Sequence, residues 1–388
     1  MYNMKKFNNK IGQSRLRQKN EEQKTRKVIN MAVFRKIGVL TSGGDAPGMN
    51  ACVKAVVNKA ISLGIEVIGV NGGYAGLIQG DLIPLTHNHV NNIVSKGGTV
   101  LYSSRCPEFK TEEGISRAVE TCKKNHIDAL ICIGGDGTFR GATDMTLHGI
   151  PSIGLPGTID NDITATDYTI GLDTCINTAT RFIDQLCDTC ESHARLNVVE
   201  VMGRDCGQVA LYAAIASGAV AVAVPEVPFD EAAAIEKIRK LRASGKRSMI
   251  VVVSEGVFNP DGSKYGPTLT KKIEAETGVE CKFACLAHVV RGGDPTVRDR
   301  VTATEMAVRA VELLVQGKSN LVMCELDGEI HPVDISFALI ADRMYKNKLK
   351  DGDLEKFTSE EVAAMEALRE KRTAEINRLY QVAQDVSF

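Results

Sequence analysis

The chain has 388 residues, of which 44% are apolar, and its formal net charge is −1. This length is enough for two domains with buried cores, and the absence of any run of 18 apolar residues argues against a membrane span. The balanced charge gives no general attraction to nucleic acid. We therefore expect neither a membrane nor a nucleic-acid partner.

Residues 1–30 differ from the rest, because they carry nine Lys and Arg against two Glu. They lack apolar periodicity and the hydrophobic core of a signal peptide. We interpret them as a basic, disordered extension, or as sequence upstream of a functional start at Met31.

Eleven cysteines are scattered along the chain, and several lie in apolar stretches. This pattern predicts buried, reduced thiols in a cytoplasmic protein. Cys187 and Cys190 form a lone CxxC without a second pair, and His87 and His89 are better explained by a solvated loop than by a metal site.

From Phe34 onward, short aliphatic runs alternate with longer helical patterns. The expected strands lie within residues 36–42, 66–73, 128–138, 150–158, 196–207, 219–229 and 247–258. The expected helices lie within residues 43–64, 115–127, 139–149, 174–193 and 356–383.

Continuous aliphatic strands separated by helices are typical of parallel sheets covered on both faces. The size and strand count predict an α/β protein with two doubly wound, Rossmann-like units. The last helix is amphipathic, and its apolar side chains are expected to pack on the body or on a partner. These residues are Leu354, Val362, Met365, Leu368 and Ile376.

Glycine-rich turns follow three of the expected strands, at residues 41–48, 134–138 and 154–163. Ligands of open parallel sheets bind beyond the carboxyl ends of the strands. Gly43 and Gly44 would let phosphate oxygens reach backbone N–H groups at a helix start, and Asp136 would hold Mg²⁺. One such turn is weak evidence, because sharp turns often need Gly for geometry alone.

The third turn places Asp160 and Asp162 on either side of one Asn. A polar turn is the plain alternative, whereas a calcium loop lacks its further oxygen ligands. Phosphoryl transfer needs a phosphate cradle, a metal-binding carboxylate, a base and cations. Asp160 would be the base and Asp162 would help to fix the metal or its water, with Arg105 and Arg204 as candidate cations.

Seven stretches together resemble the ATP-dependent 6-phosphofructokinase family, over about residues 34–345. They read IGVLTSGGDAPGMNA, IGGDGT, GLPGTIDND, TDYTIGLDT, VVEVMGRDCG, VPEVPF and HVVRGGDPTVRDR. The resemblance implies transfer of the γ-phosphate of ATP to the 1-hydroxyl of fructose 6-phosphate, with Mg²⁺. It also implies two domains with the active site in the cleft between them.

The resemblance assigns roles by position. The catalytic positions are Asp160, Asp162, Thr158 and Arg204. The nucleotide and Mg²⁺ positions are Gly44, Tyr74, Arg105, Cys106, Asp136, Gly137 and Thr138, with Asp136 as the metal residue. The sugar-phosphate positions are Arg195, Met202, Gly203, Glu255, Lys282, His288 and Arg291.

The same resemblance divides the chain into four parts. Residues 31–171 with 290–345 would bind ATP and Mg²⁺, and residues 172–289 would bind the sugar phosphate. Residues 1–30 and 346–388 would be a basic and a helical extension.

Two glycines bear on the phosphoryl donor. Pyrophosphate-using relatives typically carry Asp at the position of Gly137, Lys at that of Gly157, or both. A side chain at 137 would crowd the α-phosphate, and a Lys at 157 would replace charge that a nucleotide supplies. We therefore expect ATP as the donor.

The chain departs from the family pattern in two places. Lys282 replaces an Arg for the 6-phosphate and lacks its bidentate fork, so a related sugar phosphate could compete. Because Arg195 and residue 282 reach a neighbouring subunit's site in the family, we expect a homo-oligomer, commonly a tetramer. The bacterial effector site keeps little charge, so we expect no usual effector response. Its positions match Lys54, Asn58, His87, Cys187 and Val220.

Three alternatives stay open at this point. A pyrophosphate-dependent enzyme conflicts with Gly157. A non-catalytic regulatory subunit predicts a lost base or metal carboxylate, yet Asp136, Asp160 and Asp162 are all present. A lipid or NAD kinase fits the GGDG turn but leaves the other motifs unexplained.

Overall fold

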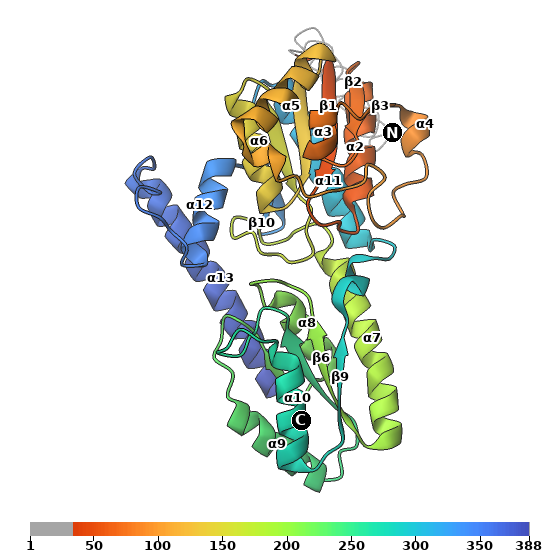
Figure 1. Cartoon of the computed structure of the whole chain (residues 1–388), viewed down its shortest axis with the longest axis vertical. Helices are drawn as coiled ribbons and strands as arrows, with labels where there is room; N and C mark the ends of the chain where they lie inside the picture. Colours follow the sequence, from red (N-terminus) through yellow and green to blue (C-terminus); the bar gives the residue numbers. More distant parts are fainter. Residues whose placement is uncertain (1–33, 388) are drawn as a thin grey trace, which may run out of the picture.

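The computed structural model describes residues 34–387, which form two sheets with helices on both faces of each (Figure 1). The expected basic extension, residues 1–30, lies outside the described residues. We call the part around the larger sheet the large lobe and the part around the smaller sheet the small lobe. No helix within residues 34–387 is long and apolar enough to cross a bilayer.

The large lobe contains a seven-stranded sheet in the order β11-β10-β5-β4-β1-β2-β3. Its central strands are parallel, and the edge strands β3 and β11 are antiparallel to their neighbours. The strands are β1 Lys36–Ser42, β2 Glu66–Val70, β3 Leu82–Leu85, β4 Ala129–Gly134, β5 Ser152–Pro156, β10 Leu321–Leu326 and β11 Glu329–Asp334.

The small lobe contains a four-stranded parallel sheet in the order β7-β8-β6-β9. Its strands are β6 Leu196–Val201, β7 Ala221–Ala223, β8 Met249–Ser254 and β9 Cys281–Cys285. The expected strand over residues 219–229 is therefore much too long. Pro225 lacks the N–H that a further ladder bond needs, and the chain turns back through a bridge between Val224 and Val227.

Helices cover both sheets and connect them. In the large lobe they are α2 Met49–Ser62, α3 Tyr74–Gln79, α4 His87–Val90, η1 Glu108–Lys110, α5 Glu112–Lys124, α6 Asp136–Leu147, α11 Val297–Val315 and α12 Ile335–Tyr345. In the small lobe they are α8 Gln208–Ser217, α9 Glu231–Ala243 and α10 Tyr265–Thr277. The chain passes between the lobes through α7 Leu172–His193 and η2 Ala287–Arg291, and α13 Ser359–Asp385 ends it.

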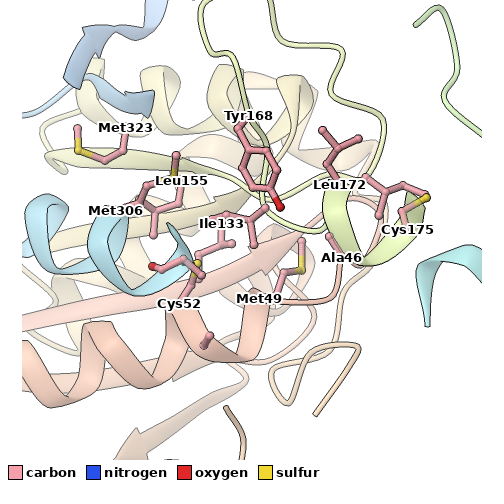
Figure 2. Close-up of a cluster of buried hydrophobic side chains, with 14 of the residues drawn as sticks. Ala46, Met49, Cys52, Ile133, Leu155, Tyr168, Leu172, Cys175, Met306 and Met323 are labelled. Carbon is pink, nitrogen blue, oxygen red and sulfur yellow. Dashed lines mark hydrogen bonds between the residues drawn. The ribbon is translucent and has the colours of Figure 1, made fainter. Parts of the chain in front are cut away.

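One continuous apolar core runs from the α2 and α11 side of the large sheet into the small lobe. Figure 2 shows part of this core, where Met49 begins the helix that follows the first glycine turn, and Ile133 and Leu155 lie in the strands before the other two turns. Tyr168 and Leu172 lie beside them at the start of α7. The packing beneath the turns thus holds the loop edge of the large sheet rigid.

The start of α7 is held by one buried carboxylate. Asp299 of α11 accepts hydrogen bonds from the hydroxyl of Tyr168 at 2.5 Å, from Gly171 N at 2.6 Å and from Thr174 N at 2.9 Å. Burial raises the pKa of Asp299, although these bonds oppose the shift. The joint between the acidic turn and the small lobe is therefore fixed from the core side.

Candidate active site

The three glycine turns lie side by side, as the sequence predicts. They follow β1, β4 and β5, which are adjacent and parallel in the large sheet. Thr138 Oγ1 donates to Ser42 O at 3.1 Å, and Gly157 N donates to Gly134 O at 3.0 Å. The carboxyl ends of the three strands therefore present one continuous rim of turns.

The acidic turn holds its first carboxylate under cover. Asp160 is only 3% exposed, and its backbone N–H donates to Thr158 Oγ1 at 3.3 Å. The Oδ1 atom of Asp160 is buried and has no hydrogen-bond partner among the described residues. A buried carboxylate oxygen without a donor is free to accept one from a bound hydroxyl.

Two arginines from different elements flank Asp160. Arg204 follows β6 in the small lobe, with Nε 3.7 Å from Asp160 Oδ2 and Nη1 3.6 Å from Asp162 Oδ2. Arg291 ends η2, with Nη2 3.8 Å from Asp160 Oδ1. The distances exceed those of tight hydrogen bonds, so both cations remain available to a phosphate.

The pKa of Asp160 reflects this environment. Burial, and next the charge of Asp162, raise it to about 6, although the charges of Arg291 and Arg204 oppose the shift. A carboxylate with a pKa near 6 is ionised at neutral pH but is a stronger base than an ordinary Asp. Its position and basicity both suit proton abstraction from a hydroxyl.

A lysine that the sequence motifs do not include lies behind the second carboxylate. Lys346, just after α12, donates to Asp162 O at 2.9 Å and to Asp342 Oδ2 at 2.9 Å. Burial opposes its charge, but Asp162 and Asp342 together raise the pKa of Lys346 to about 12. Lys346 therefore neutralises the back of the acidic turn, and no sequence signal pointed to it.

A hollow of about 480 Å³ lies between the first glycine turn, residues 99–105 and η2. It brings together expected nucleotide positions and expected sugar-phosphate positions. Its lining residues are Gly43, Gly44, Asp45, Thr99, Tyr102, Ser103, Arg105, His288 and Arg291. A Cβ at Gly44 would lie 2.8 Å from Arg291 Nη1, so a side chain here would displace the end of Arg291.

Other expected nucleotide positions support the rim from below. Tyr74 is 4% exposed, and its hydroxyl donates to Thr138 O at 2.7 Å. Its ring stacks on Phe109 with centroids 4.0 Å apart. Cys106 packs half-buried against the same core. Tyr74 therefore shapes the second turn and is covered by other residues, whereas Gly137 is open on its Cβ side.

The expected sugar positions divide into two groups. In the first, Glu255 Oε1 accepts from Gly203 N at 3.2 Å and from Arg204 N at 3.0 Å. This contact holds Arg204 in a left-handed conformation, with φ 51°, two residues after the buried Met202. The group lies at the carboxyl end of β6 and faces the acidic turn.

The second group is not brought to this site within one chain. Arg195 Nε lies 2.8 Å and Lys282 Nζ 3.0 Å from the carboxylate of Glu280. The contacts of Arg195 and Lys282 lower the pKa of Glu280 to about 2. These residues lie at the amino ends of β6 and β9, which is the opposite end of the small sheet from Arg204.

The residues present suit a magnesium ion. No group of three or more His, Cys, Asp or Glu side chains within residues 34–387 forms a dedicated metal cage. Mg²⁺ normally takes one or two carboxylates and completes its shell with water and substrate phosphates. Asp136, which pairs with Arg140 at 3.1 Å at the start of α6, fits such a single-carboxylate role.

The expected effector positions are occupied by contacts within the chain. Lys54 Nζ donates to Asn91 O at 2.8 Å, and His87 Nδ1 lies 2.8 Å from Asn58 Oδ1. Val220 is 1% exposed, and Cys187 is half-buried. Nothing here tests the expected lack of an effector response, which stays a prediction.

Comparison with known proteins identifies the family. Residues 36–314 match the model of a protein family that is described as Phosphofructokinase. The chain belongs to the phosphofructokinase family. It is therefore a phosphotransferase whose family acts on a sugar hydroxyl, and the resemblance drawn from the sequence motifs is confirmed.

Two curated relatives each match at least three quarters of this chain. The ATP-dependent 6-phosphofructokinase 1 of Clostridium perfringens is 48% identical over 316 residues, which are 81% of this chain and 97% of the relative. The ATP-dependent 6-phosphofructokinase of Lactobacillus johnsonii is 50% identical over 290 residues, which are 75% of this chain and 89% of the relative.

Solved structures confirm the expected fold class of this phosphofructokinase. The phosphofructokinase of Saccharomyces cerevisiae superposes with a TM-score of 0.77 at 30% identity, over 89% of this chain and 49% of that chain. A pyrophosphate-dependent phosphofructokinase from Marinobacter aquaeolei gives 0.69 at 21% identity, over 84% of this chain and 87% of that chain. The second likeness supports the fold alone.

Proposed function

We propose that this phosphofructokinase transfers the γ-phosphate of ATP to the 1-hydroxyl of fructose 6-phosphate, giving fructose 1,6-bisphosphate and ADP. The observation that carries the proposal is Asp160, a buried carboxylate that lies between Arg204 and Arg291 and has one oxygen without a hydrogen bond among the described residues. The names of the curated relatives support the choice of donor and acceptor. The proposal places the enzyme in glycolysis and in the cytoplasm.

The reaction divides among these residues. Asp160 accepts the proton of the 1-hydroxyl as its oxygen attacks the γ-phosphorus, and the bond from the γ-phosphorus to the bridging oxygen breaks with its electron pair on ADP. Arg204 offsets the negative charge on the transferring group. Thr158, at the start of the acidic turn, contacts the same group. Asp162, held by Lys346, fixes the water shell beside it.

A magnesium ion would be held by Asp136 together with the nucleotide phosphates. When bound, it would neutralise charge on the β- and γ-phosphates. Gly43 and Gly44 present backbone N–H groups to the phosphates near the start of α2. The sugar phosphate in the active site of the same chain would be bound by Met202, Gly203, Glu255, His288 and Arg291.

A homo-oligomer, proposed as a tetramer, would complete the sugar site. Arg195 and Lys282 form their own cluster away from Asp160 and carry the charge that a 6-phosphate needs. We assign them to the site of a neighbouring subunit. The four-part division of the chain is likewise proposed, with η2 and α7 as the passages between the two binding domains.

The proposal is tested by a coupled assay for fructose 1,6-bisphosphate. Purified protein receives fructose 6-phosphate and Mg²⁺ with either ATP or pyrophosphate. Product with ATP alone is expected. Product with pyrophosphate alone would refute the donor assignment, and no product with either donor from folded protein would refute the proposed reaction.

A further inference from the structure

The last helix crosses from one lobe to the other. Figure 1 shows α13 running from beside α12 of the large lobe down to α8 of the small lobe. Its buried side chains include Met365, which packs with α12, and Ile376 and Leu379, which join the core that reaches the small lobe. The helix lies outside residues 36–314, the part that matches the family description.

One charged residue of α13 points inward. Arg372 is 5% exposed, and its Nη2 atom donates to the carbonyl oxygens of Asn161 at 3.3 Å, Ile163 at 3.2 Å and Thr166 at 2.9 Å. A buried arginine is costly unless its partners are well placed, and an aliphatic side chain would pack more cheaply. The three carbonyls account for Nη2, whereas Nη1 makes no hydrogen bond among the described residues and lies 3.6 Å from Glu375 Oε2.

The segment that Arg372 holds is the one that carries the acidic pair. Residues 158–167 belong to no helix or strand, so their backbone groups lack regular partners. Asn161, between Asp160 and Asp162, adopts a left-handed conformation with φ 49°. This conformation is uncommon for a residue with a side chain, so the turn needs support from outside itself.

The same arginine lies where the lobes meet. The side-chain amide of Asn161 contacts Gln208 at the start of α8, in the small lobe. Burial raises the pKa of Glu226, which follows β7, and the charge of Arg372 opposes that shift. Glu226 in turn accepts from Gly207 N at 2.8 Å. Arg372 therefore contacts the acidic turn directly, and its charge also favours the ionised form of Glu226 in the small lobe.

We propose that Arg372 is a positioning residue for phosphoryl transfer, an inference that rests on the function proposed above. By gathering the carbonyls of Asn161, Ile163 and Thr166, it holds the acidic turn so that Asp160 stays between Arg204 and Arg291. It touches neither substrate nor reacting atoms. Because Arg372 belongs to α13, the packing of this helix helps to set the distance between Asp160 and Arg204 of the small lobe.

The test compares Arg372→Met with Arg369→Met, an exposed arginine about one turn earlier on the same helix. Displacing a catalytic group by about 1 Å costs up to about 100-fold in rate, so Arg372→Met is expected to lower kcat at least tenfold. The KM for ATP should stay within twofold, because the turn after β1 is untouched. Arg369→Met should leave both constants within twofold, and Arg372→Lys should recover part of kcat.

The pH profile separates positioning from general loss of structure. Burial is the first cause that raises the pKa of Asp160. A loosened turn lets water reach the carboxylate, so its pKa falls and the acid limb of kcat/KM moves to lower pH in Arg372→Met. An acid limb unchanged from wild type, together with a kcat like that of Arg369→Met, overturns the proposal.

Hydrogen exchange gives a readout that does not need activity. Backbone amides in residues 159–167 should exchange faster in Arg372→Met than in Arg369→Met, while those of β4 stay protected. If the wild type makes no fructose 1,6-bisphosphate, the proposed function fails, and this exchange still decides the role of Arg372. Unchanged exchange overturns that role. If Arg372→Met does not fold, Arg372→Lys supplies the same comparison.

Discussion

At the scale of single residues, the burial of the Asp160 carboxylate lowers the stability of the fold at neutral pH. Asp160 has a folded-state pKa of about 6, above its ordinary value of 3.8, chiefly because it is buried. Such a group stabilises the fold below its unfolded pKa, and that contribution is lost as pH rises from 3.8 to 6. Above pH 6 the Asp160 carboxylate is ionised while buried away from water, and this burial of charge lowers the free energy of unfolding.

Asp160→Asn is therefore expected to be inactive and more stable. Loss of a general base costs about 10² to 10⁴ in kcat. At pH 7.5 the amide avoids the penalty of the buried charge, which corresponds to roughly 1 to 3 kcal/mol in the free energy of unfolding. Urea unfolding at pH 7.5 and pH 4 measures this, and the gain should shrink at pH 4. A less stable variant at pH 7.5 would contradict the argument.

Gly137 tests the choice of donor at the same scale. A Cβ there meets no atom within 4 Å, and residue 137 lies in the first turn of α6, where a carboxylate is favourable. Gly137→Asp should thus fold normally and raise the KM for ATP by at least about tenfold, because like charges repel. Gly137→Ala is the matched control for size. An unchanged KM for ATP in Gly137→Asp would refute a role for this glycine.

Gly157 is more closely surrounded than Gly137. A Cβ at this position lies 3.1 Å from both Ile133 Cγ2 and Met49 Cε. A side chain at 157 would need Ile133 or Met49 to shift by a few tenths of an ångström. Packing therefore bears on Gly157 as well as the donor, whereas Gly137 is open on its Cβ side.

At the scale of elements, the start of α13 is specified by a capping box. Thr358 Oγ1 accepts from Glu361 N at 3.2 Å, and Glu361 Oε2 accepts from Thr358 N at 2.8 Å. These bonds satisfy two groups that a helix end leaves open. The cap determines where the helix that carries Arg372 begins.

Thr358→Ala should lower the free energy of unfolding by about 1 kcal/mol. The control is Thr373→Ala, at an exposed position within the same helix, where alanine is the better helix former and no loss is expected. Urea unfolding of both variants measures the difference. Equal losses in the two variants would show that the capping box adds nothing specific.

At the scale of the whole molecule, the sugar site is expected to be shared between subunits. Asp160→Asn lacks the base, and Arg195→Ala lacks a cation for the phosphate. If Arg195 serves a neighbouring site, a hybrid oligomer that contains both variants has some sites with neither change. Co-expression should therefore restore part of the activity at low fructose 6-phosphate.

The hybrid is compared with each variant expressed alone and with the two mixed after purification. Molar mass in solution is measured for each sample. A monomeric wild type, or hybrids no more active than Arg195→Ala alone, would contradict a shared site. Activity that returns only on co-expression would support subunit exchange during assembly.

Much of the fold was predictable from local pattern. The strands that the chain encodes as continuous aliphatic runs, such as β4 and β8, are buried on both faces. Strands of mixed character were missed. In β9, at an edge of the small sheet, Lys282, Phe283 and Cys285 are exposed and only Cys281 is buried, and β11 is mostly exposed and antiparallel. Their pairing comes from tertiary neighbours rather than from their own composition.

By itself the sequence determined the family, the three turns and the residue types that phosphoryl transfer requires. Those features are local, since a turn, a strand end and an acidic pair are each encoded by adjacent residues. Only the tertiary structure decided what surrounds them. Lys346 and Arg372 reach the acidic turn from 184 and 211 residues away, respectively. Such contacts depend on how α12 and α13 pack, and no local pattern carries that information.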